Sequence, residues 1–440
     1  MSDKNDNNEC WWRNYLVVSA RTDVGMRRSN NQDSFAAEPA STPRLWKTRG
    51  HLFVVADGMG AHAAGELASK LAATLVPQSY LKRTEETPPD ALRNALLDAH
   101  AEIRKRGEID EAFRDMGTTC DALALTPEGA LVGHVGDSRV YRLRDRAIEQ
   151  LTFDHSLVWE ARRLPDSHPA YQKLTNIPKN IITRSLGPTD SLAVDVEGPF
   201  PLRPGDAFLL CSDGLSGQFE DSEIGQILEV FQPEEATETL VNLANLRGGP
   251  DNITVVVARY KAEPDWDALE REIEKAERAQ TKKAPLSTSA WTAAALAVAA
   301  FGAALGGFCG VFGASGAAVG VGASVLGAAL LGLFFWTARE RFFATQEIWN
   351  DKTWGAGPYV RSSAAPNAAF CEKVADVCDQ LCDAMREQQI FAPDWNGVAN
   401  ARAQAKTAFE RGDFAGSLRA NASVVNYMMS ELKKNAPKRR

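Results

Sequence analysis

The sequence of 440 residues predicts an α+β domain over residues 14–262, followed by a helical hairpin and a small all-α domain. Three observations predict this order. Apolar, strand-like runs in the first half repeatedly end on an aspartate, and segments 63–80 and 89–106 between them have helical spacing. No charged residue stands between positions 284 and 338. Helical spacing of apolar residues then returns after position 370.

Composition excludes some classes of function. The formal net charge of -8 and the lack of a long basic stripe argue against nucleic acid as a partner, because phosphate backbones are bound by clustered Lys and Arg. The seven cysteines are odd in number and form no C-x-x-C pair, which is typical of reduced thiols. The polar composition of residues 1–13 predicts a disordered leader, and the segment lacks the apolar run of a signal peptide.

The first strand-like run to end on an acid is LFVVADGMG at residues 52–60. Asp57 comes directly after this apolar run, so its carboxylate is held on rigid structure at the edge of the core. Gly58 and Gly60 let the backbone turn tightly and approach a ligand closely. A carboxylate at the end of a buried strand, followed by glycines, is typical of a metal ligand.

Three further acids stand beside strand-like runs. Asp137 lies in a Gly-Asp-Ser sequence that predicts a hairpin turn, Asp213 ends the run AFLLCSD, and Asp251 precedes the run ITVVV. Each one alone is more simply a turn aspartate that bonds its own backbone. Four together indicate an oxygen-rich site for Mg²⁺ or Mn²⁺, in which two ions can activate water for phosphate ester hydrolysis without a covalent intermediate.

The polar segment 21–35 places a guanidinium near a carboxylate. Arg28 could bind a phosphate bidentately, and Asp33 could orient water. A turn with solvated charges explains the same residues equally well.

Six ordered motifs carry a resemblance to a known family. They are T-D-x-G-x-x-R-x-x-N-Q-D at 22–33, D-G-M-G-x-H at 57–62, G-T-T at 117–119, G-D-S-R at 136–139, S-D-G-L at 212–215 and D-N-I-T at 251–254. Together they resemble the bacterial metal-dependent serine/threonine protein phosphatases of the PPM, or type 2C, family. The resemblance covers about residues 14–262 and implies a four-layer α-β-β-α sandwich with the metal site at one end.

The resemblance also implies a role for each matching residue. Asp57 would bridge two Mn²⁺ or Mg²⁺ ions and the Gly58 carbonyl would bind the second ion. Asp213 and Asp251 would complete the site of the first ion, and Asp137 would help to hold a third.

Further roles follow for three catalytic candidates. Arg28 would bind the phosphate and Asp33 would orient the attacking water. His62 is either the general acid for the leaving alkoxide or an outer hydrogen-bonding residue. Ala61 stands where the family usually has glycine, and residues 154–186 correspond to its variable flap.

The second half of the chain predicts a membrane anchor. Residues 263–285 predict a charged linker helix, and 286–338 predict a transmembrane hairpin of two spans. Basic residues flank both outer ends, which predicts an inner-membrane protein with both soluble parts in the cytoplasm. The alternative is a soluble Ala/Gly-rich linker.

Residues 345–440 predict a helical domain with a basic tail. Two helices divided near Gly412 loosely resemble a tetratricopeptide hairpin, and such a domain could dock a protein partner. Its cysteines at positions 371, 378 and 382 are explained better by core packing than by metal binding, because no histidine lies nearby.

The sequence therefore predicts a membrane-anchored phosphatase that acts on phosphoserine and phosphothreonine in proteins and opposes a bacterial Ser/Thr kinase. A nucleotide-binding loop is disfavoured because residues 58–65 lack the lysine and Ser/Thr of a P-loop. The remaining alternative is a catalytically weak module that binds phosphoproteins.

Overall fold

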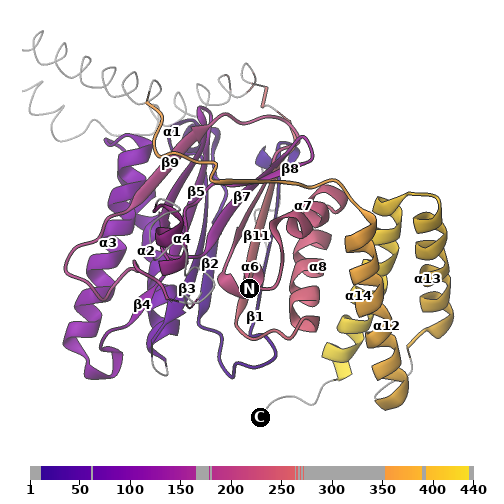
Figure 1. The fold of residues 1–440 in the computed structure, drawn as a ribbon. Coiled ribbons are helices and arrows are strands. Elements are labelled where there is room, and N and C mark those ends of the chain that lie inside the picture. Colours follow the sequence, from indigo (N-terminus) through magenta and orange to yellow (C-terminus); the bar gives the residue numbers. More distant parts are fainter. Residues whose placement is uncertain are drawn as a thin grey trace, which may run out of the picture. The chain divides into compact units, whose positions relative to one another are not determined.

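The computed structural model describes residues 11–60, 63–164, 178, 181–262, 264–265, 268, 271, 352–388 and 393–435. The chain divides into two compact units. Met1–Pro264 and Thr353–Arg440 form one unit, and Asp265–Lys352 form the other. All elements described below belong to the first unit (Figure 1).

Two antiparallel sheets form the centre of this unit. One has the strand order β1-β11-β10-β7-β8-β12, and the other has the order β2-β3-β5-β6-β9 with β4 paired to β3. The strands of the first sheet are β1 (Leu16–Asp23), β7 (Arg139–Arg144), β8 (Ala147–Gln150), β10 (Ala207–Cys211), β11 (Ile253–Tyr260) and β12 (Val360–Ser363). Those of the second are β2 (Asp33–Glu38), β3 (His51–Met59), β4 (Gly117–Thr118), β5 (Cys120–Thr126), β6 (Gly129–Val135) and β9 (Asp195–Phe200).

Helices cover the outer faces of both sheets. Helices α2 (Ala64–Lys82) and α3 (Pro88–Ile109) pack on the second sheet, and α7 (Asp221–Val230) and α8 (Pro233–Leu246) pack on the first (Figure 1). Strands β5, β6 and β10 are buried along their whole length because each has a covered face on both sides. The four layers confirm the predicted α-β-β-α sandwich.

The turn around Asp137 is not the hairpin that the sequence predicted. Strand β6 pairs with β5 and β9 in one sheet, whereas β7 pairs with β8 and β10 in the other. The chain crosses between the sheets at Gly136, where φ is 119° and a Cβ would lie 2.5 Å from the Cβ of Thr119. The same local sequence can form either a hairpin turn or a crossing between two sheets. Which one forms depends on the distant strands that pair with β6 and β7.

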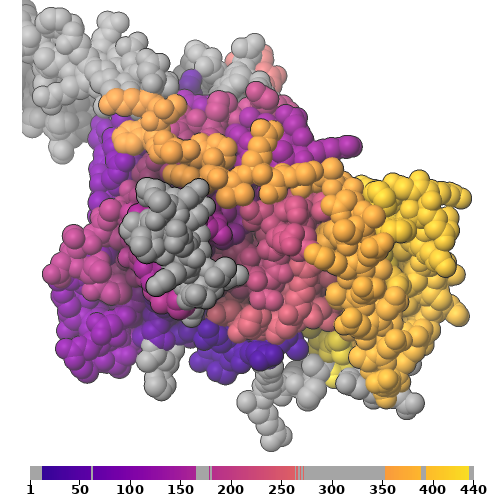
Figure 2. Space-filling view, viewed as in Figure 1, coloured from indigo at the N-terminus to yellow at the C-terminus, as the bar shows by residue number. Residues whose placement is uncertain are grey.

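The C-terminal helices pack on the same side as α7 and α8. They are α12 (Ala368–Gln388), α13 (Trp395–Glu410) and α14 (Phe414–Asn435), and α12 and α14 share one buried apolar core with α7 and α8. Before them, β12 extends the first sheet by pairing with β8. Figure 2 shows this segment running over the surface of the sandwich toward the C-terminal helices.

The structure corrects the prediction of an inner-membrane protein with two spans. Among the described residues, no helix combines the length and the apolar character needed to cross a bilayer. The long helices α2, α3, α12 and α14 each carry exposed charged residues, since each has one solvated face. The hairpin predicted at 286–338 lies outside the described residues, as does most of the linker at 263–285.

A buried histidine at the start of β3 predicts a pH dependence of stability. His51 is 4% exposed, its Nδ1 accepts a hydrogen bond of 2.9 Å from the Ala40 amide, and burial lowers its pKa to about 3. Between pH 6.5 and about 3 the unfolded chain therefore binds a proton that the folded chain does not, so stability falls as the pH falls.

We expect the free energy of unfolding to drop by about 1.4 kcal/mol per pH unit more in the wild type than in His51→Asn below pH 6.5. Urea unfolding of both proteins at pH 7, 6 and 5 measures the difference. Parallel curves would show that His51 does not cause the dependence.

Candidate active site

Four predicted metal ligands reach one end of the sandwich from four separate segments. Asp57 lies near the end of β3, and Asp213 begins the short helix α6 (Asp213–Ser216) directly after β10. Asp251 precedes β11, and Asp137 lies in the crossing between β6 and β7. The strand pairing places the end of β10 beside the starts of β7 and β11, so the acids gather at one edge.

Burial and the charges of neighbouring carboxylates raise the pKa values of several acids in the cluster. Burial raises the pKa of Asp57 well above its usual range, and the charges of Asp33 and Asp213 raise it further. Burial and then Asp213 raise the pKa of Asp137 to about 7. Burial and then the charge of Asp251 raise the pKa of Asp213. Buried carboxylates that repel one another need a cation, or protons, to stay together.

Asp33 belongs to this cluster through the sheet register. It pairs directly with Asp57 across β2 and β3 and is only 7% exposed. The Ser212 hydroxyl donates a hydrogen bond of 2.7 Å to its Oδ2, and that hydroxyl in turn accepts one of 3.0 Å from the Thr254 amide. Burial raises the pKa of Asp33 to about 7, although the Ser212 hydrogen bond lowers it. One carboxylate oxygen is thus fixed by the protein.

Backbone contacts hold Asp57 and Gly58 in place. The Asp57 amide donates to Thr119 Oγ1 at 2.9 Å, and the Asp57 carbonyl accepts from the Thr119 amide and from Thr118 Oγ1, each at 2.9 Å. A Cβ at Gly58 would lie 2.0 Å from the Gly65 carbonyl oxygen, so the position requires glycine. The G-T-T motif therefore supports the strand end that carries the bridging candidate.

Arg28 lies at the rim of the acid cluster. Its Nη2 donates a hydrogen bond of 2.7 Å to Asp251 Oδ2, and its side chain is 51% exposed. The loop before it is fixed by hydrogen bonds from the amides of Met26 and Arg27 to the Gly249 carbonyl, at 2.8 and 3.2 Å. A guanidinium in this position can meet both the acids and a phosphate arriving from solvent.

Asn252 is a site residue that the sequence reasoning did not single out. Its Oδ1 accepts a hydrogen bond of 2.8 Å from the Gln32 amide, and its Nδ2 donates to the carbonyls of Val24 and Asn30 at 3.0 and 2.9 Å. One buried side chain thus joins the loop 24–32 to the start of β11. In the sequence, Asn252 is the asparagine of the D-N-I-T motif and directly follows the predicted metal ligand Asp251.

Replacing Asn252 with alanine should release the loop that positions Arg28. We expect KM for a phosphopeptide to rise by about tenfold, because three hydrogen bonds of roughly 1 kcal/mol each are lost from a loop that the substrate must then order. Steady-state kinetics would measure the change. Asn94→Ala, on the outer helix α3, is the control. An unchanged KM would show that the loop is held by its other contacts.

The arginine of G-D-S-R supports the site from outside. Arg139 donates to Asp154 from Nε at 3.0 Å and from Nη2 at 2.7 Å, and its Nη1 donates to the Tyr141 hydroxyl at 2.9 Å. Asp154 opens the predicted flap, of which the structure describes the helix α4 (Leu157–Arg162). Arg139 therefore fixes the base of the flap to the strand that follows Asp137.

The acid cluster fits hydrated divalent cations. Buried oxygens of three acids, Asp33 Oδ1, Asp137 Oδ1 and Asp213 Oδ1, have no hydrogen-bond partner in the described structure. No group of three or more His, Cys, Asp or Glu side chains in the described residues is arranged to hold a metal by itself. Free carboxylate oxygens are the donors that Mg²⁺ and Mn²⁺ prefer, so the three unpartnered oxygens can contribute to such a site. His62 lies outside the described residues.

Comparison with known proteins gives the family. Residues 26–247 match the family model described as protein phosphatase 2C. Protein phosphatase PhpP of Streptococcus pneumoniae is 37% identical over 252 residues, which is 56% of this chain and 99% of that protein. The structure of PppA from Pseudomonas aeruginosa is 34% identical with a TM-score of 0.47, over 56% of this chain and 98% of that one.

A third comparison concerns a metal complex. The catalytic domain of the serine/threonine protein phosphatase PstP, solved with two manganese ions, is 32% identical with a TM-score of 0.46, over 56% of this chain and 99% of that one. The family model covers half of this chain, and PhpP is matched almost from end to end. The chain belongs to the protein phosphatase 2C family of metal-dependent serine/threonine protein phosphatases.

Proposed function

We propose that this chain hydrolyses phosphoserine and phosphothreonine in proteins with two Mn²⁺ or Mg²⁺ ions, and with a third at Asp137. The observation that carries the proposal is the meeting of five acids from distant segments, of which Asp33 and Asp137 are buried and three have an unpartnered oxygen. When bound, the ions neutralise phosphoryl charge and activate water for in-line attack. Divalent cations bound between the carboxylates would relieve the repulsion among them.

Each residue of the chain then has a defined task. Asp57 and the Gly58 carbonyl would help to hold both ions, and Asp213 and Asp251 would complete the ligands of the first. Their rigid attachment to strand ends keeps these oxygens in place before the ions arrive.

The remaining residues act on water and substrate. Asp33, fixed by Ser212, orients the attacking water through its free oxygen. Arg28 shifts from Asp251 toward the phosphate and neutralises its charge. His62 is proposed as the general acid for the leaving alkoxide. A Ser/Thr kinase must supply the phosphoproteins that this reaction consumes.

Phosphate release from a phosphothreonine peptide by the full chain tests the proposal. We expect activity with Mn²⁺, loss of activity with EDTA, and recovery on adding Mn²⁺. Release that is unaffected by EDTA would overturn the metal mechanism. Peptide binding without phosphate release would instead support a phosphoprotein-binding module.

A further inference from the structure

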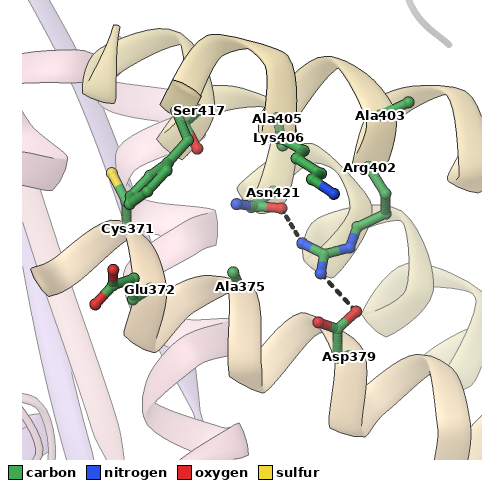
Figure 3. A pocket seen from close by; sticks show the side chains of 11 residues that line it. Cys371, Glu372, Ala375, Asp379, Arg402, Ala403, Ala405, Lys406, Ser417 and Asn421 are labelled. Carbon is green, nitrogen blue, oxygen red and sulfur yellow. Dashed lines mark hydrogen bonds and ion pairs between the residues drawn. The ribbon is translucent and has the colours of Figure 1, made fainter. Parts of the chain in front are cut away.

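The C-terminal helices line an open cavity of about 440 Å³ (Figure 3), and none of its lining residues belongs to the acid cluster. Its floor is formed by buried residues of α12, α13 and α14, namely Cys371, Ala405, Ser417 and Asn421. The volume lies within the range of about 300–1,000 Å³ that is typical of small-ligand sites. Its lining combines the apolar side chains of three alanines and Phe409 with six polar or charged residues, among them the acids Glu372 and Asp379.

The polar groups at one end of the cavity are mainly hydrogen-bond donors. Arg402 Nη1 donates to Asn421 Oδ1, and its Nη2 pairs with Asp379 Oδ1 at 2.5 Å. Because its oxygen is engaged, Asn421 directs its amide nitrogen into the cavity, and Lys406 extends toward the same space (Figure 3). Asn421 is only 2% exposed, and no described residue accepts a hydrogen bond from its Nδ2.

The Asn421 amide nitrogen opens onto the cavity, where a ligand can accept its hydrogen bond in place of water. Of the two acids that line the cavity, Asp379 is 60% exposed and paired with Arg402, and Glu372 lies at the other end near Cys371 (Figure 3), so neither is paired with Lys406. An anionic acceptor with two oxygens would satisfy the amide and the ammonium together.

We propose that this cavity binds a carboxylate that carries a short apolar group. The carboxylate accepts hydrogen bonds from Asn421 Nδ2 and Lys406 Nζ, and the apolar group lies against Ala375, Ala405 and Phe409. Two sources share this chemistry: a small organic acid, and the free C-terminus of a peptide that ends in an apolar residue. The site is independent of phosphate hydrolysis.

Calorimetric titration of the full chain tests the site with three probes: hexanoate, acetyl-Gly-Ala-Leu with a free carboxylate, and the same peptide as its C-terminal amide. We expect the free-acid peptide to bind at least about tenfold more tightly than the amide. This ratio corresponds to the one charge-assisted hydrogen bond that the amide cannot make. Tighter binding of hexanoate than of the peptide would identify a small organic acid as the ligand.

Variants locate the binding. Lys406→Met and Asn421→Leu should each weaken the tighter free-acid probe by about tenfold or more. Lys434→Met, which removes the same charge from the exposed end of α14, should leave binding unchanged. Lys406 is exposed, so Lys406→Met remains informative if Asn421→Leu fails to fold. Equal binding of the acid and amide peptides without tighter binding of hexanoate, no binding by any probe, or wild-type affinity in Lys406→Met would overturn the proposal.

Discussion

Replacing Asp57 with asparagine is expected to lower phosphatase turnover by at least about 100-fold, while the protein stays folded. The side chain keeps its size but loses the charge that would bridge two ions. Phosphate release from a phosphothreonine peptide, measured with saturating Mn²⁺, gives the loss. A reduction of less than about threefold would remove Asp57 from the metal site.

Stability separates lost metal binding from lost folding. In the metal-free protein Asp57→Asn should be at least as stable as the wild type, because burial and the neighbouring carboxylates raise the pKa of Asp57 and its ionised form opposes folding. Mn²⁺ at about 100 times its Kd should add about 2.7 kcal/mol to the wild type and much less to the variant.

A matched control lies at the opposite end of the first sheet, in the turn between β7 and β8. Asp145→Asn makes the same chemical change at an exposed turn where φ is 51°, a conformation that asparagine accepts readily. We expect it to change neither turnover nor the Mn²⁺ effect. A loss of activity there would point to a general effect of charge.

The sequence was sufficient to predict the acid cluster because each member carries a local signal. Asp57, Asp213 and Asp251 stand at the boundary between an apolar strand and a turn, and strand ends of one sandwich meet at its edge. The role of Asn252 was less visible, because its three partners lie in a loop more than 200 positions away along the chain. A hydrogen-bonding side chain reveals its partners only after folding.

Pairing between strands that lie far apart in the sequence explains the other differences between the predicted and the observed fold. The crossing at Gly136 looked like a hairpin because sheet membership is decided by β9 and β10, which follow much later in the chain. Strand β12 is short, and its pairing with β8 joins Val360 to Gln150. The periodicity of a strand predicts which residues face a core but not which sheet it joins.

The sequence also did not predict the interface between the C-terminal helices and α8. Helical spacing showed that α12 and α14 have apolar faces, but not what covers them. In the structure Asn242 Nδ2 donates to Asn426 Oδ1 at 2.9 Å, and Asn426 Nδ2 donates to Thr239 Oγ1 at 3.0 Å. Lys373 Nζ of α12 donates to Glu223 Oε1 of α7 at 3.0 Å. These polar contacts surround a shared apolar core and fix the register of the two layers.

Ending the chain at residue 262 should therefore lower the midpoint of thermal unfolding by more than about 10 °C and cause self-association. The deletion removes the buried side chains of Phe370, Val374, Val425 and Met428, each of which stabilises by about 1.5–3 kcal/mol, and 1 kcal/mol corresponds to about 2–4 °C in a domain of this size. It also exposes the apolar face of α7 and α8 and the edge of β8. Thermal melts and light scattering of both chains measure the effects.

A point variant tests the same interface without a deletion. Met428 is fully buried in the shared core, so Met428→Ala should cost about 2–5 kcal/mol in the full chain, whereas Lys434→Ala on the exposed end of the same helix should change stability by less than about 0.5 kcal/mol. If the interface is built as described, both the deletion and Met428→Ala lower the same cooperative transition. Two separate transitions, with only the smaller one shifted in Met428→Ala, would mean that the C-terminal helices unfold independently of the sandwich.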